Sequence, residues 1–413
     1  MSKDYPSTKF ERSSRMAKTG LKVGKNYAKH YLKKSLGHKK SQSDEAIKGI
    51  HSESAEALYN EFANLRGTAL KIAQSLSMEK GLMPEEFTET FSQAQYSVPP
   101  INKALARSII KRELGGYPEQ IFANFQVDAK AAASIGQVHR ATLKDGRDVV
   151  VKIQYPNVRN TIESDLGVAK MIFKRFTKGD LSDYFEEVRD RLMEETDYIH
   201  EGQQITAFRE RFQGNGYELP EWIEEFSTAK VLTMTYLEGK HLDKYLKSDP
   251  TQEEKNHYGQ LMWDFFHLQI ERDKPIHADT HPGNFLFMPG GKLGIIDFGC
   301  VKSFPEDFFK DYMRLLPVHL ERDDQKLIDL YEELDIIKDP ELSTDLERDF
   351  FEFCKSYAML FAKPYMNATF DFSRREYRKR LKQHAKTFPD MREPRGSKHF
   401  IYSTKVHLGL FNL

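Results

Sequence analysis

The first strong hydrophobic pattern along the chain is helical and starts near residue 55. Apolar side chains recur there at steps of three and four positions, which places them on one face of a helix. They are Leu58, Phe62, Leu65, Ala69, Ile72 and Leu76. This pattern predicts helical structure over about 55–94. After the break at Pro99–Pro100, residues 102–114 form another predicted helix, which ends at Gly115–Gly116.

The sequence pattern changes over residues 122–153, where short β-prone runs are separated by turn-forming residues. Val149–Ile153 is a strongly β-prone run, and Lys144–Gly146 supplies a turn ahead of it. Residues 160–208 return to a helical pattern. Lys230–Tyr236 is then a further predicted strand.

Beyond this strand the pattern is mostly helical. Phe285–Phe287 and Leu293–Ile296 flank Pro289–Gly291, and together they predict a small hairpin. A small β-rich unit with an inserted helix therefore precedes a larger helical unit, and residues 230–236 lead from one to the other. This order is typical of the two lobes of a kinase.

Composition narrows the class of protein. The 413 residues include 62 Lys+Arg and 62 Asp+Glu, and this zero net charge gives no case for a nucleic-acid partner. With only two cysteines, Cys300 and Cys354, a disulfide framework is not expected and a reducing compartment is favoured. We see no apolar run of transmembrane length and no signal-peptide pattern, so we expect a cytoplasmic protein.

The charge is unevenly distributed. Residues 1–40 are rich in Lys and Arg, and only Asp4 and Glu11 oppose them. A rough apolar helical face in this segment suggests a basic amphipathic helix that brings the protein to an anionic membrane surface. The simpler alternative is a solvated basic tail. In either case residues 41–50 are predicted to form a polar linker.

A loop and the strand end that follows it carry the strongest chemical signal. His277–Asn284 reads His-Ala-Asp-Thr-His-Pro-Gly-Asn, and a later apolar run ends at Asp297–Gly299. Phosphoryl transfer needs a carboxylate near the attacking hydroxyl and oxygen ligands for Mg²⁺. Asp279, Asn284 and Asp297 supply both, so these motifs predict an ATP site of the kinase type. The alternative is that Asp279 and Asn284 only cap turns.

Three further residues bear on this site. Lys152 lies in the predicted strand 149–153 and points away from its apolar neighbours, where it could reach nucleotide phosphates. His277 is predicted to be a structural hydrogen-bonding residue. The role of His281 is left open, because the two histidines have no clear third partner for a metal site.

An alanine-rich segment stands where a protein kinase has its glycine-rich phosphate loop. It consists of Ala131, Ala132, Ala133, Ser134, Ile135, Gly136 and Gln137. Alanine lets the backbone approach phosphate but disfavours the positive φ angles that glycine adopts. Ser134 and Gln137 add hydrogen-bonding groups. Taken alone, an alanine run would predict the start of a helix.

Together these motifs resemble the AarF/ABC1/UbiB family of atypical kinases, which includes the coenzyme Q8-type mitochondrial proteins. The resemblance runs from about residue 55 to the end of the chain. It rests on Lys71–Gln74, Ala131–Gln137, Val149–Gln154, Glu195–Asp197, His277–Asn284 and Asp297–Gly299.

The resemblance implies an α+β, bilobal protein-kinase-like fold with a family-specific N-terminal extension. A basic extension and linker would occupy residues 1–50. A helical extension would follow over 51–120. The β-rich N-lobe would span 121–236 and the helical C-lobe 237–413.

The resemblance also implies roles for individual residues. Lys152 would contact the ATP phosphates and pair with Glu201. Asn284 and Asp297 would hold Mg²⁺, and Asp279 would stand where a catalytic base stands. The other nucleotide contacts would come from Ala131–Gln137, Met234 and Tyr236.

The extension carries its own motif. Lys71 and Gln74 match the KxGQ signature of the family, which lies on a helix that covers the cleft. In relatives this lysine interacts with a Glu-x-Asp motif, here Glu195 and Asp197, where a protein substrate would otherwise dock. Ala73 replaces the usual glycine of the signature, and this departure bears on how closely the helix approaches the cleft.

The function implied by the resemblance is an atypical kinase or ATPase that uses ATP and Mg²⁺. It would support isoprenoid-quinone biosynthesis or membrane lipid homeostasis, with quinone-biosynthesis proteins as possible partners. One alternative is a catalytically silent nucleotide-binding scaffold, which the intact Lys, Asp and Asn positions disfavour. Another is a protein kinase, which the short segment after Asp297–Gly299 disfavours.

Overall fold

The computed structural model describes part of the chain, in the following ranges. They are 14–15, 18–19, 21, 23–25, 28, 44–65, 68–69, 71–72, 86–87, 90, 100–133, 135–174, 182–270, 274–387, 389, 395–397 and 399–413. The chain divides into two compact units. The first takes Met1–Lys178, Ser182–Arg211 and Leu219–Leu237, and the second takes Gly179–Leu181, Phe212–Glu218 and Glu238–Leu413.

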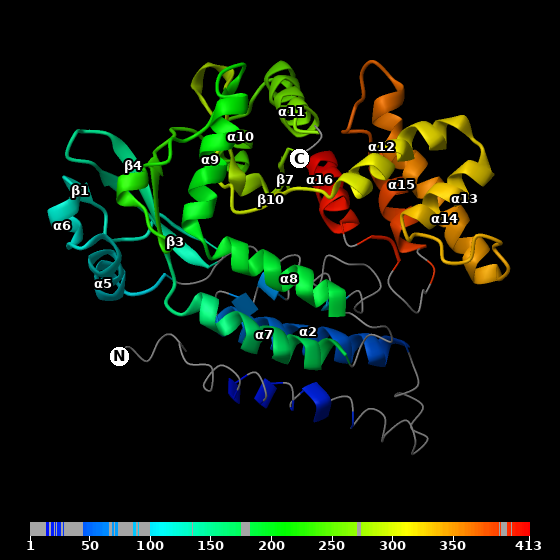
Figure 1. Ribbon diagram of the computed structural model, residues 1–413, viewed down its shortest axis with the longest axis horizontal. Helices are drawn as coiled ribbons and strands as arrows, with labels where there is room; N and C mark the ends of the chain where they lie inside the picture. Colours follow the sequence, from blue (N-terminus) through cyan, green and yellow to red (C-terminus); the bar gives the residue numbers. More distant parts are fainter. Residues whose placement is uncertain are drawn as a thin grey trace. The chain divides into compact units, whose positions relative to one another are not determined.

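An antiparallel sheet forms the centre of the first unit, with strand order β1–β3–β4–β6 and with β2 paired to β3 (Figure 1). Its strands are β1 (Asn124–Phe125), β2 (Ala131–Ala132), β3 (Gly136–Thr142), β4 (Asp148–Gln154) and β6 (Val231–Thr235). The predicted strands around 149–153 and 230–236 are therefore confirmed. Val149, Val151 and Ile153 are fully buried, as expected for β-branched side chains in a central strand.

The alanine-rich segment is a strand and a tight turn, so the alternative of a helix start is wrong. Ala131 pairs with Val138, and Ala132 pairs with Gln137. The Ala133 N–H donates to the Gly136 carbonyl at 2.8 Å, which closes the turn. Pairing with β3 outweighs the helix propensity of alanine, because propensity is a weak preference that tertiary context overrides.

Helices accompany this sheet in the first unit. They are α2 (Asp44–Leu65), α5 (Lys103–Leu114), α6 (Pro118–Ile121), α7 (Val158–Phe173), α8 (Ser182–Glu195) and α9 (Tyr198–Phe212, whose last residue belongs to the second unit), with the 3₁₀ turn η2 (Glu224–Phe226). Helices α7 and α8 lie side by side (Figure 1). The Asn102 side chain caps α5, and Gly115 ends it with a φ of 80°, which confirms the helix predicted there.

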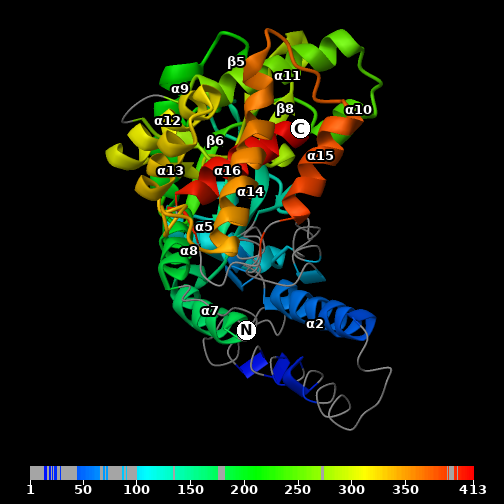
Figure 2. The ribbon, with the colours of Figure 1, turned by 90° about the vertical axis from the view of Figure 1, so that its right-hand side faces the viewer.

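The second unit is mostly helical. Its helices are α10 (Leu242–Leu246), α11 (Gln252–His267), α12 (Glu306–Glu321), α13 (Asp324–Glu333), α14 (Asp345–Ala362), α15 (Arg375–Lys386) and α16 (Phe400–Asn412). The 3₁₀ turns are η3 (Pro282–Asn284), η4 (Pro289–Gly291) and η5 (Lys363–Met366). Helices α14 and α15 lie against each other (Figure 2).

Two small sheets accompany these helices. In one, β8 (Phe285–Phe287) pairs antiparallel with β9 (Leu293–Ile295), and β5 (Tyr217–Glu218) adds to β9 in parallel. This confirms the predicted hairpin. In the other, β7 (Ile276–His277) pairs with β10 (Val301–Lys302). The first unit, with its five-stranded sheet, and the mostly helical second unit make this an α+β protein, as predicted.

The structure bears on the predicted absence of a membrane span and on the predicted N-terminal helices. Within the described ranges, no helix combines the length and the apolar character needed to cross a bilayer. Most of the predicted helical stretch beyond residue 65 lies outside the described residues. The described positions there, 68–69, 71–72, 86–87 and 90, are helical.

Candidate active site

The loop after β7 brings a carboxylate and an amide together in the second unit. The Asn284 side-chain Nδ2 donates to Asp279 Oδ2 at 3.1 Å and to the Asp279 carbonyl at 3.3 Å. Because the two polar atoms of an amide point apart, this bond turns the Oδ1 acceptor of Asn284 away from Asp279. The loop therefore presents an ionisable acceptor and a neutral oxygen ligand from one short segment.

His277 links this loop to the strand end that carries Asp297. The ring is fully buried, and its Nε2 donates to the Asp297 carbonyl at 2.7 Å. Its Nδ1 accepts from the Asp279 N–H at 3.4 Å, and its backbone N–H donates to Gln269 Oε1 at 2.5 Å. These partners require the neutral tautomer with the proton on Nε2. The predicted structural role of His277 is confirmed.

The Asp297 side chain is held at the start of its turn. Its Oδ1 accepts from the Gly299 N–H at 3.0 Å, and the Ile296 N–H donates to the Asn284 carbonyl at 3.1 Å. The hairpin and His277 thus place Asp279, Asn284 and Asp297 on one hydrogen-bonded framework.

The donor set suits magnesium better than a transition metal. Among the described residues, no group of three or more His, Cys, Asp or Glu side chains could hold a metal ion. Mg²⁺ does not require such a group, because it is usually bound by one or two protein oxygen ligands together with phosphates and waters. Asn284 and Asp297 are the residues that could hold it.

His281 is also seated within the loop. Its Nδ1 accepts from the Gly283 N–H at 3.0 Å. A Cβ atom on Gly283 would lie 2.8 Å from that same nitrogen, so only glycine leaves room for the ring. The ring orientation is therefore set by the backbone of the loop.

A buried ion pair marks the first unit. Lys152 Nζ lies 2.9 Å from both carboxylate oxygens of Glu201 on α9. The two side chains are only 10% and 4% exposed. The ammonium group also lies 5.0 Å from the centre of the Tyr198 ring, within the range of a cation–π interaction. The pairing expected of Lys152 and Glu201 is present, and its part in nucleotide binding stays a prediction.

The turn at the alanine-rich segment depends on Gly136. A Cβ atom there would overlap the Ile153 carbonyl of β4 and would lie 2.8 Å from the Tyr198 hydroxyl. The close approach of β3 to β4 at this point therefore requires glycine. Ser134 lies outside the described residues.

The Gln137 side chain does not reach the surface of the loop. It is buried, its Oε1 accepts from the Ile101 N–H at 2.8 Å, and its Nε2 lies 2.9 Å from His139 Nε2. His139 Nδ1 bonds to the Gln126 carbonyl at 2.9 Å, and burial lowers the pKa of this histidine. Any contact of Gln137 with nucleotide is thus left to its backbone.

The motif residues of the extension are only partly described. Lys71 Nζ lies 3.3 Å from Glu195 Oε1, so the pair expected from the resemblance is present. Asp197 accepts from the Ile199 N–H at 3.1 Å, at the start of the helix that carries Glu201. Gln74 and Ala73 lie outside the described residues.

Met234 and Tyr236 lie at the end of β6. Met234 is buried, and its backbone forms an isolated antiparallel β-bridge with that of Trp222. The Arg140 guanidinium stacks over the Tyr236 ring at 4.1 Å. One face of this ring is therefore occupied, and its contact with nucleotide stays a prediction.

No pattern in the sequence singles out Tyr198, Gly409 or Thr280. Tyr198 reads as an ordinary apolar position of a helix, and only the tertiary structure sets its ring beside Lys152. In the same way, Gly409 on α16 meets Thr280 of the loop, although far from it in sequence.

Comparison with known proteins identifies the family. The model of the ABC1 atypical kinase-like domain matches residues 93–331, which is more than half of the chain. The atypical kinase COQ8, mitochondrial, of Saccharomyces cerevisiae is 33% identical over 66% of this chain and 56% of its own length. The chloroplastic protein ACTIVITY OF BC1 COMPLEX KINASE 8 of Arabidopsis thaliana is 32% identical over 66% of this chain and 38% of its own.

A solved structure agrees with the fold. The complex of Rv3197 with erythromycin from Mycobacterium tuberculosis is 25% identical and superposes with a TM-score of 0.59, covering 89% of this chain and 93% of that one. The matched part of this chain spans about half or less of the two curated relatives. The kinase-like α+β fold and the family match together show that this chain belongs to the ABC1 atypical kinase-like family.

Proposed function

We propose that this protein binds Mg-ATP and transfers its γ-phosphoryl group to water or to a small hydroxyl compound. The observation that carries the proposal is the framework around His277. It joins the Asp279 and Asn284 loop to the Asp297 strand end through hydrogen bonds of 2.7 and 3.4 Å. Two carboxylates and an amide oxygen, preorganised in this way, are the groups that phosphoryl transfer requires.

In this proposal each group has one task. Asn284 and Asp297 would hold Mg²⁺, which would neutralise part of the phosphate charge. Lys152, oriented by Glu201, contacts the phosphates. The bond between the γ-phosphorus and the bridging oxygen breaks, a bond to the acceptor oxygen forms, and the acceptor proton passes to Asp279. ADP leaves with the bridging oxygen.

The extension supports an acceptor that is not a protein. Lys71 is paired with Glu195 at 3.3 Å, on the motif where the resemblance places the covering helix. The segment after Asp297–Gly299 also reaches α12 at Glu306 quickly, which leaves little length for a phosphorylated activation loop. Both features favour a small acceptor or water.

The proposal also assigns this activity to a lipid pathway. We infer a role in isoprenoid-quinone biosynthesis or membrane lipid homeostasis from the resemblance, and the similarity to the mitochondrial kinase COQ8 supports it. The basic residues 1–40 would bring the protein to an anionic membrane surface. Quinone-biosynthesis proteins would be its partners there.

One experiment tests both the nucleotide site and the link to a lipid pathway. Mg-ADP affinity and ATP turnover are measured for the natural protein, for Asp297→Asn and for Asp329→Asn, each with and without anionic liposomes or quinone-precursor mimics. Asp329 is a matched control, because it lies on α13 and accepts only a local bond from Gln325. We expect Asp297→Asn to lose Mg-nucleotide affinity by at least about 100-fold, and the control to keep it.

The outcomes separate the alternatives. Unchanged affinity of Asp297→Asn would refute the site assignment. Binding without turnover in any arm would favour the silent scaffold. A response of turnover to liposomes or mimics would support the lipid link, whereas turnover indifferent to both would remove that link and leave the nucleotide site in place.

A further inference from the structure

Helix α16 reaches the loop that carries Asp279. Gly409 of α16 faces Thr280, the next residue after Asp279, and a Cβ atom at position 409 would overlap the Thr280 hydroxyl oxygen. The same Cβ would lie 2.6 Å from Thr280 Cβ and 3.4 Å from its Cγ2. Real Cβ atoms do not approach so closely, so no other residue fits at 409 while Thr280 keeps its place. Thr280 itself is buried.

Aromatic contacts hold both ends of α16 in the second unit. At its start, the Phe400 ring packs 5.2 Å from Phe308 and 6.1 Å from Tyr312 on α12. Near its end, the Phe411 ring lies 5.2 Å from Phe372 and 5.6 Å from Phe361. The helix therefore spans two anchors, and Gly409 lies close to the second.

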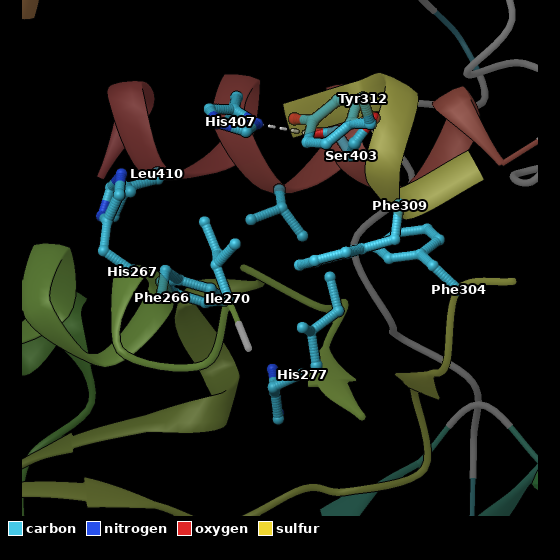
Figure 3. Close-up of a pocket in the computed structure, with 12 residues that line it drawn as sticks. Phe266, His267, Ile270, His277, Phe304, Phe309, Tyr312, Ser403, His407 and Leu410 are labelled. Carbon is cyan, nitrogen blue, oxygen red and sulfur yellow. Dashed lines mark hydrogen bonds between the residues drawn. The ribbon is translucent and has the colours of Figure 1, made fainter. Parts of the chain in front are cut away.

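Between the anchors the packing is incomplete. A cavity of about 30 Å³ lies between α11, α12 and α16, and His277 contributes to its wall (Figure 3). Figure 3 shows His407 and Ser403 on α16 at one side of this space and His277 at the other. Such a volume holds no more than one or two waters. Gly409 is next to Leu410 of the cavity wall, and it makes a close contact with the loop at Thr280.

We propose that Gly409 is a positioning residue for the reaction and acts through Thr280. In this proposal the backbone of α16 at Gly409 packs directly against Thr280 and limits the movement of the loop. Thr280 in turn sets the position of the neighbouring Asp279 carboxylate. The proposal rests on the proposed function, because it assigns Gly409 to a phosphoryl-transfer site. Its structural part, the control of the loop by α16, can be measured without any activity.

The consequence for catalysis follows from the geometry. A methyl group at position 409 must push either α16 or Thr280 away. The hydrogen bonds of His277 to the Asp297 carbonyl and to the Asp279 N–H hold the start of the loop, so a displaced Thr280 would turn the neighbouring Asp279. A misplacement of about 1 Å at a catalytic group can reduce turnover by about 100-fold. Lys152 and Glu201 belong to the other unit, and their ion pair would be unchanged.

The experiment is a double-mutant cycle in the full chain. It compares the natural protein with Gly409→Ala, Thr280→Gly and the double variant, because Thr280→Gly removes all three atoms that a Cβ at 409 would meet. Gly259→Ala is the matched control. Gly259 lies on α11 of the same unit, and a Cβ there would meet nothing within 4 Å. The measurements are deuterium uptake of residues 277–284, Mg-ADP affinity and ATP turnover.

We expect Gly409→Ala to lower kcat by about 10- to 100-fold with Mg-ADP affinity changed by less than about threefold, and to speed deuterium uptake in the loop. In the Thr280→Gly background the same substitution should have no further effect. Gly259→Ala should leave all three measurements unchanged.

Three results would overturn the proposal. The first is normal turnover and uptake in Gly409→Ala. The second is the same loss from Gly409→Ala with and without Thr280→Gly. The third is a Gly409→Ala protein that misfolds and is not rescued in the double variant, since the overlap with Thr280 would then not be the cause. If the natural protein has no turnover, the proposed function fails, and the uptake cycle still decides whether Gly409 positions the loop.

Discussion

At the scale of single residues, the Lys152–Glu201 pair places two opposite charges in the interior of the first unit. Both side chains are almost fully buried, and the ammonium group contacts both carboxylate oxygens at 2.9 Å. Taking two charges out of water is costly, and their attraction repays that cost only while both are present. The pair therefore contributes little net stability. Removal of either partner alone leaves the other charge buried and unpaired, which is strongly destabilising.

A first prediction concerns this pair. Glu201→Ala and Lys152→Met should each lower the free energy of unfolding by about 3–5 kcal/mol, whereas the double variant should cost less than the sum. The chain has two tryptophans, and Trp222 belongs to the first unit. Urea unfolding followed by fluorescence in a Trp263→Phe background therefore reports on the first unit alone.

The exposed Lys103–Asp128 pair of the first unit is the control for this measurement. Its partners are 64% and 81% exposed, so water already solvates both charges and Asp128→Ala should change stability little. Additive losses in the Lys152 and Glu201 cycle would contradict the assignment of a coupled buried pair.

At the scale of elements, helix α9 positions Glu201 by packing onto the loop that precedes β6. Gly202, the next residue, lies against the indole ring of Trp222, and a Cβ atom at 202 would lie 2.5 Å from the indole Nε1. Asp197 accepts a hydrogen bond at the start of the same helix. The position of α9, and with it the carboxylate that holds Lys152, thus depends on a helix glycine that propensity alone would disfavour.

A second prediction tests this contact. Gly202→Ala should force Trp222 and α9 apart, lower the stability of the first unit by about 1–3 kcal/mol and weaken Mg-nucleotide binding. Gly167→Ala on α7 is the matched control, because a Cβ at 167 would meet nothing within 4 Å. It should raise stability by about 0.5–1 kcal/mol through helix propensity. A Gly202→Ala variant as stable as the control would show that the indole does not restrain α9.

At the scale of the whole molecule, buried histidines in both units couple stability to pH. Burial lowers the pKa of His139 in the first unit, and of His267, His319 and His407 in the second. In the neutral form, His319 donates from Nδ1 to the Leu315 carbonyl at 2.6 Å and accepts at Nε2 from the Tyr331 hydroxyl at 2.8 Å. Burial disfavours the charged form of this ring.

A third prediction follows with its sign. The folded state holds these histidines neutral, and the unfolded chain takes up their protons near its ordinary pKa of about 6.5. Their contribution is therefore complete above that pH and is lost as the pH falls toward the lowered pKa values of the folded state. The slope is at most about 1.4 kcal/mol per pH unit for each proton taken up.

Urea unfolding between pH 7.5 and 5 measures this slope. His319→Gln should reduce the slope in the second unit, followed through Trp263 in a Trp222→Phe background, and should leave the slope of the first unit unchanged. A pH-independent free energy of unfolding over this range would contradict the neutral, buried state of these histidines.

Much of the fold was predictable because its signals are local. The β-branched run at 149–153, the Pro-Gly-Gly turn between β8 and β9, and the glycine after residue 114 each act through neighbouring positions, so periodicity and turn chemistry report them directly. The same holds for His277–Asn284 and Asp297–Gly299. Their residue types and order predict a kinase-type loop without reference to the rest of the chain, and the family match agrees with the kinase-like class.

Other features depend on contacts between residues far apart in the chain. Nothing near Gln137 predicts that its side chain is buried on Ile101, and nothing near Gly409 predicts that it meets Thr280. Sequence spacing determines which face of an element a residue occupies, but the partner on that face is set by how the elements pack. The order of the elements and the motifs thus predicted the α+β class and the family. Only the tertiary structure shows these long-range contacts, because the packing of the elements decides which residues become neighbours.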